Sequence, residues 1–272
     1  MKDKIRILVV NDDGYFAKGI HALAEALSGI GKVTVVAPDS QKSAVSHLLT
    51  ITDSIRVREV PFSDGIKAYA VSGSPADCGK IAVTSLMKDN PPDLVASGIN
   101  LGNNAGLNAI YSGTVAAAAE AAFAGLQAFA ISLDAFSNPD FGPAADFAVK
   151  FAKYLVRNPL PKGILANINI PALPAEKIKG FKISEQSMLR YNEWYASRAD
   201  IYGRRHYWLE GQYSAVNDGK ADSDISALAD GYISITPLHF DLTARKGIDI
   251  LKKNNFMILY NKENCTTGEA YD

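Results

Sequence analysis

Two adjacent carboxylates, Asp12 and Asp13, directly follow a short and mostly aliphatic run, Ile5–Val10. Such a run is typical of a strand that is buried on both faces, as strands of parallel sheets are. In open α/β sheets, loops meet at the carboxyl ends of the strands and form binding sites there. The sequence Asn11 to Gly14 also fits a plain turn, because Asn, Asp and Gly all favour turns. The two acids are therefore a candidate site, with a simple turn as the alternative.

Further oxygen ligands follow later strands of the same pattern. The next loop offers the hydroxyls of Ser40 and Ser43, and a Gly- and Asn-rich segment, 97–114, offers the amides of Asn100 and Asn104. Since parallel strands point the same way, these loops share one edge of the sheet with the two aspartates. Carboxylate, hydroxyl and amide oxygens suit Mg²⁺, Mn²⁺ or Ca²⁺ better than zinc or copper. Together they predict a divalent-cation site.

The segment 97–114 also predicts an anion site. It opens directly into an Ala-rich helix, and a Gly-rich backbone can turn its N–H groups inward at the positive end of a helix dipole. It lacks the Gly-Lys-Ser/Thr of a Walker loop. A divalent cation and an anion site beside it can together promote the hydrolysis of a phosphate ester. We expect cation-activated water to attack a phosphate that is held by Ser112, Gly113, Thr114 and the Gly-Asn loop.

Alternating strand and helix patterns must position these loops. They predict an α/β fold with a doubly wound, mostly parallel, Rossmann-like sheet and a C-terminal β-rich arm. We expect a catalytic core over 1–183 and, over 184–272, an extended arm, a final strand and a C-terminal helix and tail. The predicted strands span 5–10, 32–37, 55–60, 67–71, 93–97, 127–132, 164–170 and 232–236, and the predicted helices span 19–27, 75–87, 115–123, 143–156 and 242–252.

Ser74 and Pro75 mark the start of the predicted helix 75–87. Asp77 stands at its third position, where a carboxylate completes a capping box. We therefore interpret Asp77 as a helix cap rather than as a catalytic group.

The segment 185–215 is crowded with aromatic and arginine residues, among them Trp194, Trp208 and Arg198. Such a mixture can stack nucleic-acid bases, and it is equally typical of protein–protein interfaces. The chain has 28 basic and 29 acidic side chains, which gives no electrostatic reason to expect a nucleic-acid or membrane partner. We favour an arm that packs on another subunit.

Length and composition indicate the size of the core and the expected cellular compartment. With 272 residues, 47% of them hydrophobic, the chain can bury a sizeable core. The apolar run after Lys2 and Lys4 is too short for a signal peptide, and no segment is long enough for a membrane span. Cys78 and Cys265 match no metal or redox spacing, so a reducing, cytoplasmic setting is expected. No histidine is paired at metal-ligand spacing, although His47 lies close enough to the predicted edge to remain a candidate.

Five motifs together resemble those of the SurE nucleotidases, also called survival protein E, over most of the chain. They are VVNDDG at the first strand, APDxxxS at the second, GSPADC at 73–78, SGIN-x-G-x-N-x-G with YSGTV at 97–115, and GYISITPL near the end.

The resemblance implies a metal-dependent phosphatase of nucleoside monophosphates, a 5′-nucleotidase with 3′-nucleotidase and exopolyphosphatase activity as further expectations. One divalent cation per subunit, Mg²⁺ or Mn²⁺, is then held by Asp12, Asp13, Ser43 and Asn100. Homodimers or homotetramers with an exchanged C-terminal arm are also implied. The family often has an acid where this chain has Asn108, and an asparagine cannot take over a proton-transfer role from that acid.

The resulting site prediction assigns two sets of residues. The catalytic residues are Asp12, Asp13 and Asn11, where Asn11 could orient Asp12, touch the phosphate or only cap the turn. The residues predicted to bind phosphate are Asn11, Gly102, Asn104, Ser112, Gly113 and Thr114.

Two other classes of protein also use clustered aspartates. A receiver-type signalling domain needs a phospho-accepting aspartate where this chain has Ser97 and Gly98. A haloacid-dehalogenase-type phosphatase uses Asp-x-Asp with an aspartyl nucleophile, whereas Asp12 and Asp13 are adjacent. Adjacent acids favour cation binding over covalent catalysis.

Overall fold

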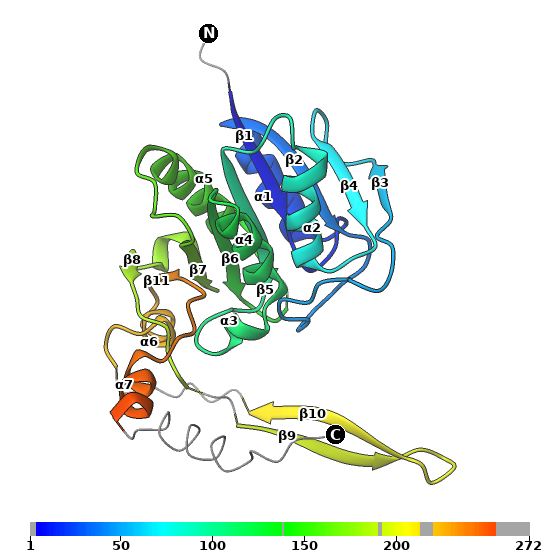
Figure 1. Cartoon of the computed structure of the whole chain (residues 1–272), viewed down its shortest axis with the longest axis vertical. Coiled ribbons are helices and arrows are strands. Elements are labelled where there is room, and N and C mark those ends of the chain that lie inside the picture. Colours follow the sequence, from blue (N-terminus) through cyan, green and yellow to red (C-terminus); the bar gives the residue numbers. More distant parts are fainter. Residues whose placement is uncertain (1–3, 138, 190–191, 213–219, 254–272) are drawn as a thin grey trace, which may run out of the picture. The chain divides into compact units, whose positions relative to one another are not determined.

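A nine-stranded sheet forms the centre of the chain in a computed structural model, which describes residues 4–137, 139–189, 192–212 and 220–253 (Figure 1). The predicted α/β fold is confirmed. The order across the sheet is β3 (Val57–Val60), β4 (Lys67–Val71), β2 (Gly31–Pro38), β1 (Ile5–Val10), β5 (Leu94–Leu101), β6 (Gln127–Asp134), β7 (Leu165–Pro171), β11 (Ile233–Leu238) and β8 (Phe181–Ile183).

Six neighbouring strands, from β4 to β7 in this order, run parallel. Strand β3 is antiparallel to β4. Strand β11 is antiparallel to β7 and parallel to β8. The last strand therefore joins the main sheet, although it follows the arm in sequence.

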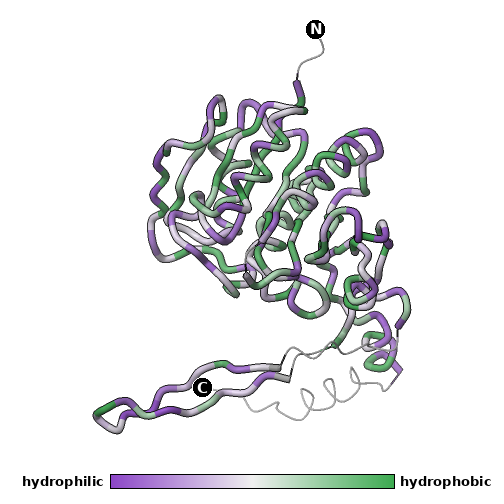
Figure 2. Tube along the Cα trace, turned by 180° about the vertical axis from the view of Figure 1, so that it is seen from behind, coloured by the Kyte–Doolittle hydropathy of each residue, from purple (hydrophilic) through white to green (hydrophobic). Residues whose placement is uncertain are grey.

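Helices cover both faces of the sheet (Figure 1). On one face lie α1 (Lys18–Ser28) and α5 (Gly142–Arg157), and on the other lie α2 (Pro75–Ile81) and α4 (Gly113–Phe123). Successive strand residues point to opposite faces, so Ile7 packs with α1 while Leu8 packs with α4. Figure 2 shows the hydrophobic stretches along these central strands.

The helix predicted over 75–87 is α-helical only to Ile81 and continues as a π-helical turn, η1 (Ala82–Leu86). The Thr84 hydroxyl donates to the carbonyl oxygen of Lys80 at 2.8 Å, one helical turn earlier. A hydroxyl that competes for a helix carbonyl loosens the regular ladder. The predicted cap is confirmed, because the Ser74 hydroxyl accepts from the Asp77 N–H and the Asp77 carboxylate accepts from the Ser74 N–H.

Strand β5 is longer than the sequence predicted. The prediction ended it at Ser97, whereas it continues to Leu101 with a shift in register between Ser97 and Asn100. Gly98 has φ +135°, and a Cβ there would stand 2.2 Å from the carbonyl oxygen of Ile131. Only glycine allows this close approach, so the start of the Gly-Asn segment is part of the sheet and not a loop.

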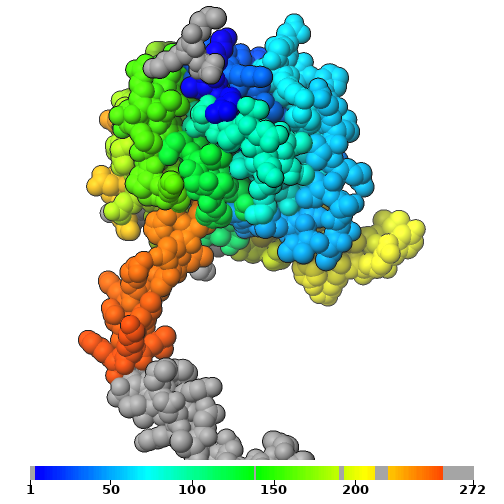
Figure 3. Space-filling model, turned by 45° about the horizontal axis from the view of Figure 1, so that its top comes forward, coloured from blue at the N-terminus to red at the C-terminus, as the bar shows by residue number. Residues whose placement is uncertain are grey.

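The rest of that segment contains a helix that the sequence did not predict, α3 (Asn108–Tyr111). Later in the chain lie η2 (Ala175–Lys177) and α6 (Asp224–Ala229). The aromatic segment forms an antiparallel hairpin of β9 (Asn192–Ala199) and β10 (Arg205–Gln212), a separate two-stranded sheet that projects as the yellow part of Figure 3.

Residues 240–272 form a second compact unit. Its described helix, α7 (Arg245–Lys253), corresponds to the amphipathic segment predicted over 242–252. The predicted tail and Cys265 lie outside the described residues. None of the helices within the described ranges is long and apolar enough to cross a membrane.

Helix α1 approaches the sheet closely at Gly19, where an added Cβ would stand 2.0 Å from the carbonyl oxygen of Ile99. We expect Gly19→Ala to lower the free energy of unfolding by about 3 kcal/mol, because the backbone of α1 or β5 must shift. Urea denaturation measures the change. Gly29→Ala is the control at the end of the same helix, since its Cβ would meet its nearest atom at 3.4 Å. Equal stability of the two variants would contradict this account of the packing.

Candidate functional site

The turn after β1 is held by its own asparagine. The Asn11 side chain is buried, donates to the Gly14 carbonyl oxygen at 2.9 Å and accepts from the Gly14 N–H at 3.2 Å. Of the three roles left open for Asn11, these contacts correspond to capping the turn. The turn fixes the direction in which Asp12 and Asp13 leave the strand.

Asp12 is only 5% exposed. Its Oδ1 accepts a 2.5 Å hydrogen bond from the Thr114 hydroxyl, which is itself buried at the start of α4. Burial raises the pKa of Asp12 to about 6, the Thr114 hydrogen bond opposes the rise, and the neighbouring Asp13 charge adds to it. The backbone N–H of Thr114 also lowers this pKa, so the positive end of α4 faces the Asp12 carboxylate.

Gly113 makes this approach of α4 possible. A Cβ at Gly113 would stand 2.8 Å from both Asp12 Cβ and Pro75 Cγ. The next residue back, Ser112, caps α4 by accepting from the Val115 N–H at 3.1 Å. Because the Ser112 oxygen accepts that bond, its hydroxyl proton remains available to a ligand.

Asp13 is half-buried, and burial raises its pKa as well. Gln41 belongs to the second loop, and its Nε2 donates to Asp13 Oδ1 at 3.3 Å and to Ser43 Oγ at 2.9 Å. The loop is joined to the turn by the Lys42 N–H, which donates to the Asp12 carbonyl oxygen at 2.7 Å. Two loops that are distant in sequence are therefore locked together beside the carboxylates.

Asn100 stands at the end of β5, and its Nδ2 donates to the Gly102 carbonyl oxygen at 2.7 Å. Its Oδ1 has no hydrogen bond within the described part of the chain and is left to a ligand. The Gly102 N–H donates to the Leu133 carbonyl oxygen at 2.9 Å, so both backbone polar groups of Gly102 have partners inside the protein.

Asn104 is anchored by three bonds to strands β6 and β7. Its Nδ2 donates to Ser132, its N–H donates to Asn169, and its carbonyl oxygen accepts from Asn167, all at 2.7–2.8 Å. Sequence reasoning missed these partners, although two asparagines in the otherwise apolar strand β7 were visible. They hold the Gly-Asn loop over the end of the sheet.

These residues surround a pocket of about 340 Å³ at the carboxyl edge of the sheet. Of the predicted site residues it is lined by Asp12, Ser43, Asn100, Asn104 and Ser112, whereas Asn11, Asp13, Gly102, Gly113 and Thr114 do not line it. The remaining lining residues are Ala44, Leu101, Asn103, Asn108, Tyr111, Glu193 and Leu209. Glu193 and Leu209 come from the hairpin, and no pattern in the sequence predicts either residue at this pocket.

The pocket suits a divalent cation. Among the described residues that line it there is no lysine, arginine or histidine, so no basic side chain balances its carboxylates. The described part of the chain also has no cluster of three or more His, Cys, Asp or Glu side chains that could hold a metal. A cation here would rest on the Asp12 carboxylate and on neutral oxygens, with Asp13 adjacent in the chain, and this donor set suits Mg²⁺ or Mn²⁺.

His47 does not line this pocket. Its Nε2 contacts Glu120 Oε1 at 2.7 Å, and Lys80 binds the other Glu120 oxygen at 3.0 Å. Glu120 is buried in α4, and these contacts lower its pKa, with the His47 contact as the largest cause. The network joins the second loop to α4 and α2.

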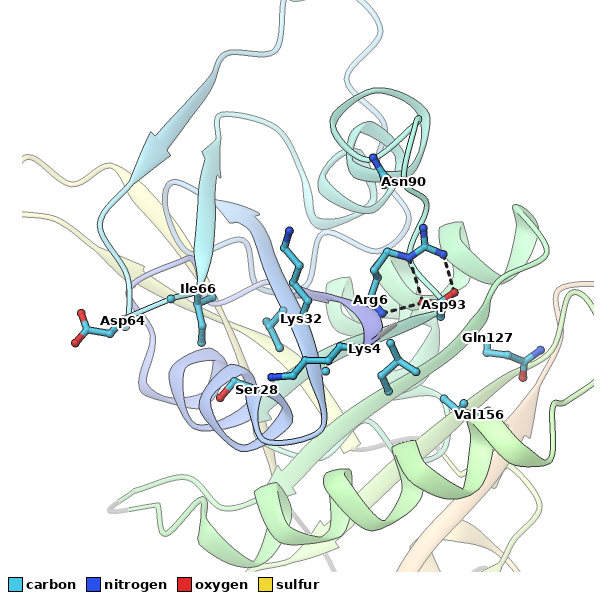
Figure 4. Close-up of a pocket in the computed structure, with 14 residues that line it drawn as sticks. Lys4, Arg6, Ser28, Lys32, Asp64, Ile66, Asn90, Asp93, Gln127 and Val156 are labelled. Atoms are coloured by element: carbon cyan, nitrogen blue, oxygen red, sulfur yellow. Dashed lines mark hydrogen bonds and ion pairs between the residues drawn. The ribbon is translucent and has the colours of Figure 1, made fainter. Parts of the chain in front are cut away.

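A larger pocket, of about 1,070 Å³, lies at the opposite edge of the sheet (Figure 4). It is lined by residues at the amino ends of strands, including Ile5 and Gly31. Arg6 and Asp93 form an ion pair there at 2.9 Å. The predicted site residues all lie at the other edge, where open α/β sheets bind their ligands.

Comparison with known proteins identifies the family. The model of the family "Survival protein SurE" matches residues 7–193. The chain belongs to the SurE family. Proteins named "5'-nucleotidase SurE" are 44% identical in Syntrophobacter fumaroxidans, over 92% of this chain and 100% of that protein, and 46% identical in Thermosynechococcus vestitus, over 91% and 95%. The crystal structure of the Sure protein from Aquifex aeolicus superposes with a TM-score of 0.79 at 37% identity, covering 91% of this chain and 98% of that one.

SurE membership disfavours both alternative classes. The adjacent aspartates are buried or held by hydrogen bonds, and the position that a receiver would need for phosphorylation carries the buried Ser97. The resemblance that the sequence motifs indicated is confirmed.

The raised pKa of Asp12 predicts a pH-dependent stability in metal-free buffer. The proton stays on folded Asp12 up to about pH 6, whereas an unfolded aspartate loses it near pH 4. The contribution of protonated Asp12 to the free energy of unfolding is therefore complete below about pH 4. It is lost as the pH rises through about 6, a change of about 3 kcal/mol. Asp12→Asn, which cannot ionise, should lose this part of the pH dependence. Unfolding by urea between pH 4 and 7.5 in EDTA measures it, and parallel profiles of the two proteins would refute the assignment.

Proposed function

We propose that this SurE protein is a 5′-nucleotidase that hydrolyses nucleoside monophosphates to nucleoside and phosphate with the help of a divalent cation. The observation that carries the proposal is the pocket in which Asp12, Ser43 and Asn100 meet Ser112 at the start of α4. Relatives that carry the name 5'-nucleotidase cover more than nine-tenths of the chain.

In this proposal Asp12, Asp13, Ser43 and Asn100 hold one cation per subunit, Mg²⁺ or Mn²⁺. When bound, such a cation neutralises phosphate charge, polarises a phosphoryl oxygen and lowers the pKa of water. Thr114 keeps the Asp12 carboxylate in place, and Gln41 does the same for Asp13 and Ser43.

The phosphate would lie against the start of α4. The Ser112 hydroxyl donates a hydrogen bond to a phosphate oxygen. The positive end of the helix dipole, at Gly113 and Thr114, stabilises the negative charge of the phosphate. Asn104 also lines the pocket, where its bond to Ser132 holds the loop in place. Asn11 and Gly102, whose polar groups are bound within the protein, act by shaping the two loops.

We further propose that the hairpin β9–β10 joins subunits into a homodimer or homotetramer. Its described aromatic residues are exposed, among them Trp208 and Tyr195, at 63% and 68%. Exposed aromatic surface of this kind is enriched in interfaces between proteins.

The proposal predicts that Asp13→Asn abolishes phosphate release and its dependence on added cation. We expect a loss of about 10³-fold or more in kcat/KM, because a cation contributes several kcal/mol to such a reaction. A screen of nucleoside 5′- and 3′-monophosphates and polyphosphate, with EDTA or with Mg²⁺, Mn²⁺ or Co²⁺, establishes the activity. Asp64→Asn, at the opposite edge of the sheet, is the control. A folded Asp13→Asn protein that binds Mg²⁺ and turns over normally would disprove the assignment.

The arm gives a separate prediction. Replacing residues 192–212 by a short Gly-Ser linker removes both hairpin strands and should lower the oligomer mass measured by light scattering. The α/β core should keep its circular dichroism spectrum, since the hairpin forms its own two-stranded sheet. An unchanged mass would count against an interface role.

A further inference from the structure

A second pocket adjoins the candidate catalytic pocket. It has a volume of about 620 Å³ and shares Asn108, Tyr111 and Glu193 with the first. Both volumes fall in the range of about 300–1,000 Å³ that is typical of small-molecule sites. The three shared residues therefore lie at the boundary between two adjoining compartments.

The second compartment differs from the first in chemistry. Besides the shared residues, it is lined by Leu107, Ile110, Met188 and Leu189, which are all apolar. The Tyr111 ring beside them is 61% exposed. Apolar side chains and an open aromatic ring suit a planar base, whereas the polar pocket suits a phosphate.

The wall that the hairpin contributes is tied to the Gly-Asn loop. Buried Asp224 accepts from the Gly106 N–H at 2.7 Å and from the Ser187 N–H at 2.9 Å. Gln186 donates to the Gly106 carbonyl oxygen at 2.9 Å. The chain that leads into β9 is thus fastened to the same loop that forms the catalytic pocket.

Glu193 sits in β9, opposite Gly211 of β10, and lines both compartments. It makes no ion pair or hydrogen bond with other described residues. In a nucleoside 5′-monophosphate, the ribose lies between phosphate and base. A carboxylate at the boundary between the two compartments therefore faces the sugar.

We propose that the second compartment binds the nucleoside and that Glu193 accepts hydrogen bonds from the ribose hydroxyls, so that the enzyme favours ribonucleotides over deoxyribonucleotides. The inference rests on the proposed nucleotidase function and adds a specificity residue to it. The two adjacent ribose hydroxyls are donors, and a carboxylate offers two acceptor oxygens to match them. A deoxyribose lacks one of these donors.

The test compares kcat/KM for AMP, dAMP and p-nitrophenyl phosphate in the full-length protein with Mn²⁺. We expect Glu193→Gln and Glu193→Ala to lower the AMP-to-dAMP ratio by about 10-fold or more, since a hydrogen bond to a charged group is being weakened or lost. The change should appear mainly in KM for AMP. Activity on p-nitrophenyl phosphate, which has no ribose, should fall much less than activity on AMP, because none of the residues proposed to hold the cation or the phosphate is changed.

Glu210→Gln is the matched control. Glu210 lies on the same hairpin, pairs with Arg198 at 2.6 Å and lines neither compartment. A second measurement avoids turnover: calorimetric titration with adenosine should show weaker binding to Glu193→Gln than to the Glu210→Gln protein.

Three results would overturn the inference: an unchanged AMP-to-dAMP ratio, an equal change in Glu210→Gln, or equal loss on all three substrates. A wild-type protein that hydrolyses p-nitrophenyl phosphate but neither nucleotide would also overturn the inference, although the protein would still be a phosphatase. Inactivity of the wild type on every ester with every cation would instead refute the proposed function itself.

Discussion

A buried carboxylate at the end of β1 is the constraint on which the rest of the site depends. Asp12 is taken out of water without a basic side chain lining its pocket among the described residues. The start of α4 compensates in part, through the Thr114 hydroxyl and the helix dipole. That requires α4 to come close, and Gly113 is the residue that allows it. The raised pKa that remains shows that the protein alone does not fully stabilise the charge, which is the situation that a bound cation resolves.

The same closeness explains the composition of α4. Its buried residues are mostly alanines, and its neighbour α2 carries Gly79, where a Cβ would stand 2.8 Å from the Ala117 carbonyl oxygen. Small side chains let α2, α4 and the sheet approach one another, and Glu120 then binds both Lys80 and His47. The small residues that let α2 and α4 pack closely therefore also determine where the start of α4 lies at the site.

The asparagines of the Gly-Asn segment divide between structure and ligand binding. Asn103 and Asn104 bind Asp134, Ser132 and β7, and so hold the loop in place. Asn100 keeps an oxygen free. Residue type alone does not separate these roles, because an amide serves equally well as a buried anchor and as a ligand. The partners that decide between them are supplied by strands some 30 to 65 residues away in sequence.

The order of most strands and helices, the parallel sheet and the edge at which three loops converge could be predicted from the sequence, because these follow from hydrophobic periodicity and from the common direction of parallel strands. Five motifs in order also identified the family. How far β5 extends could be read only from the folded chain, since its last residues depend on the approach of Ile131 to Gly98. The tertiary structure also decided which residues close the pocket: Glu193 and Leu209 reach it through a hairpin whose root is fixed by Asp224. Contacts between residues so distant along the chain leave no local pattern from which they could be predicted.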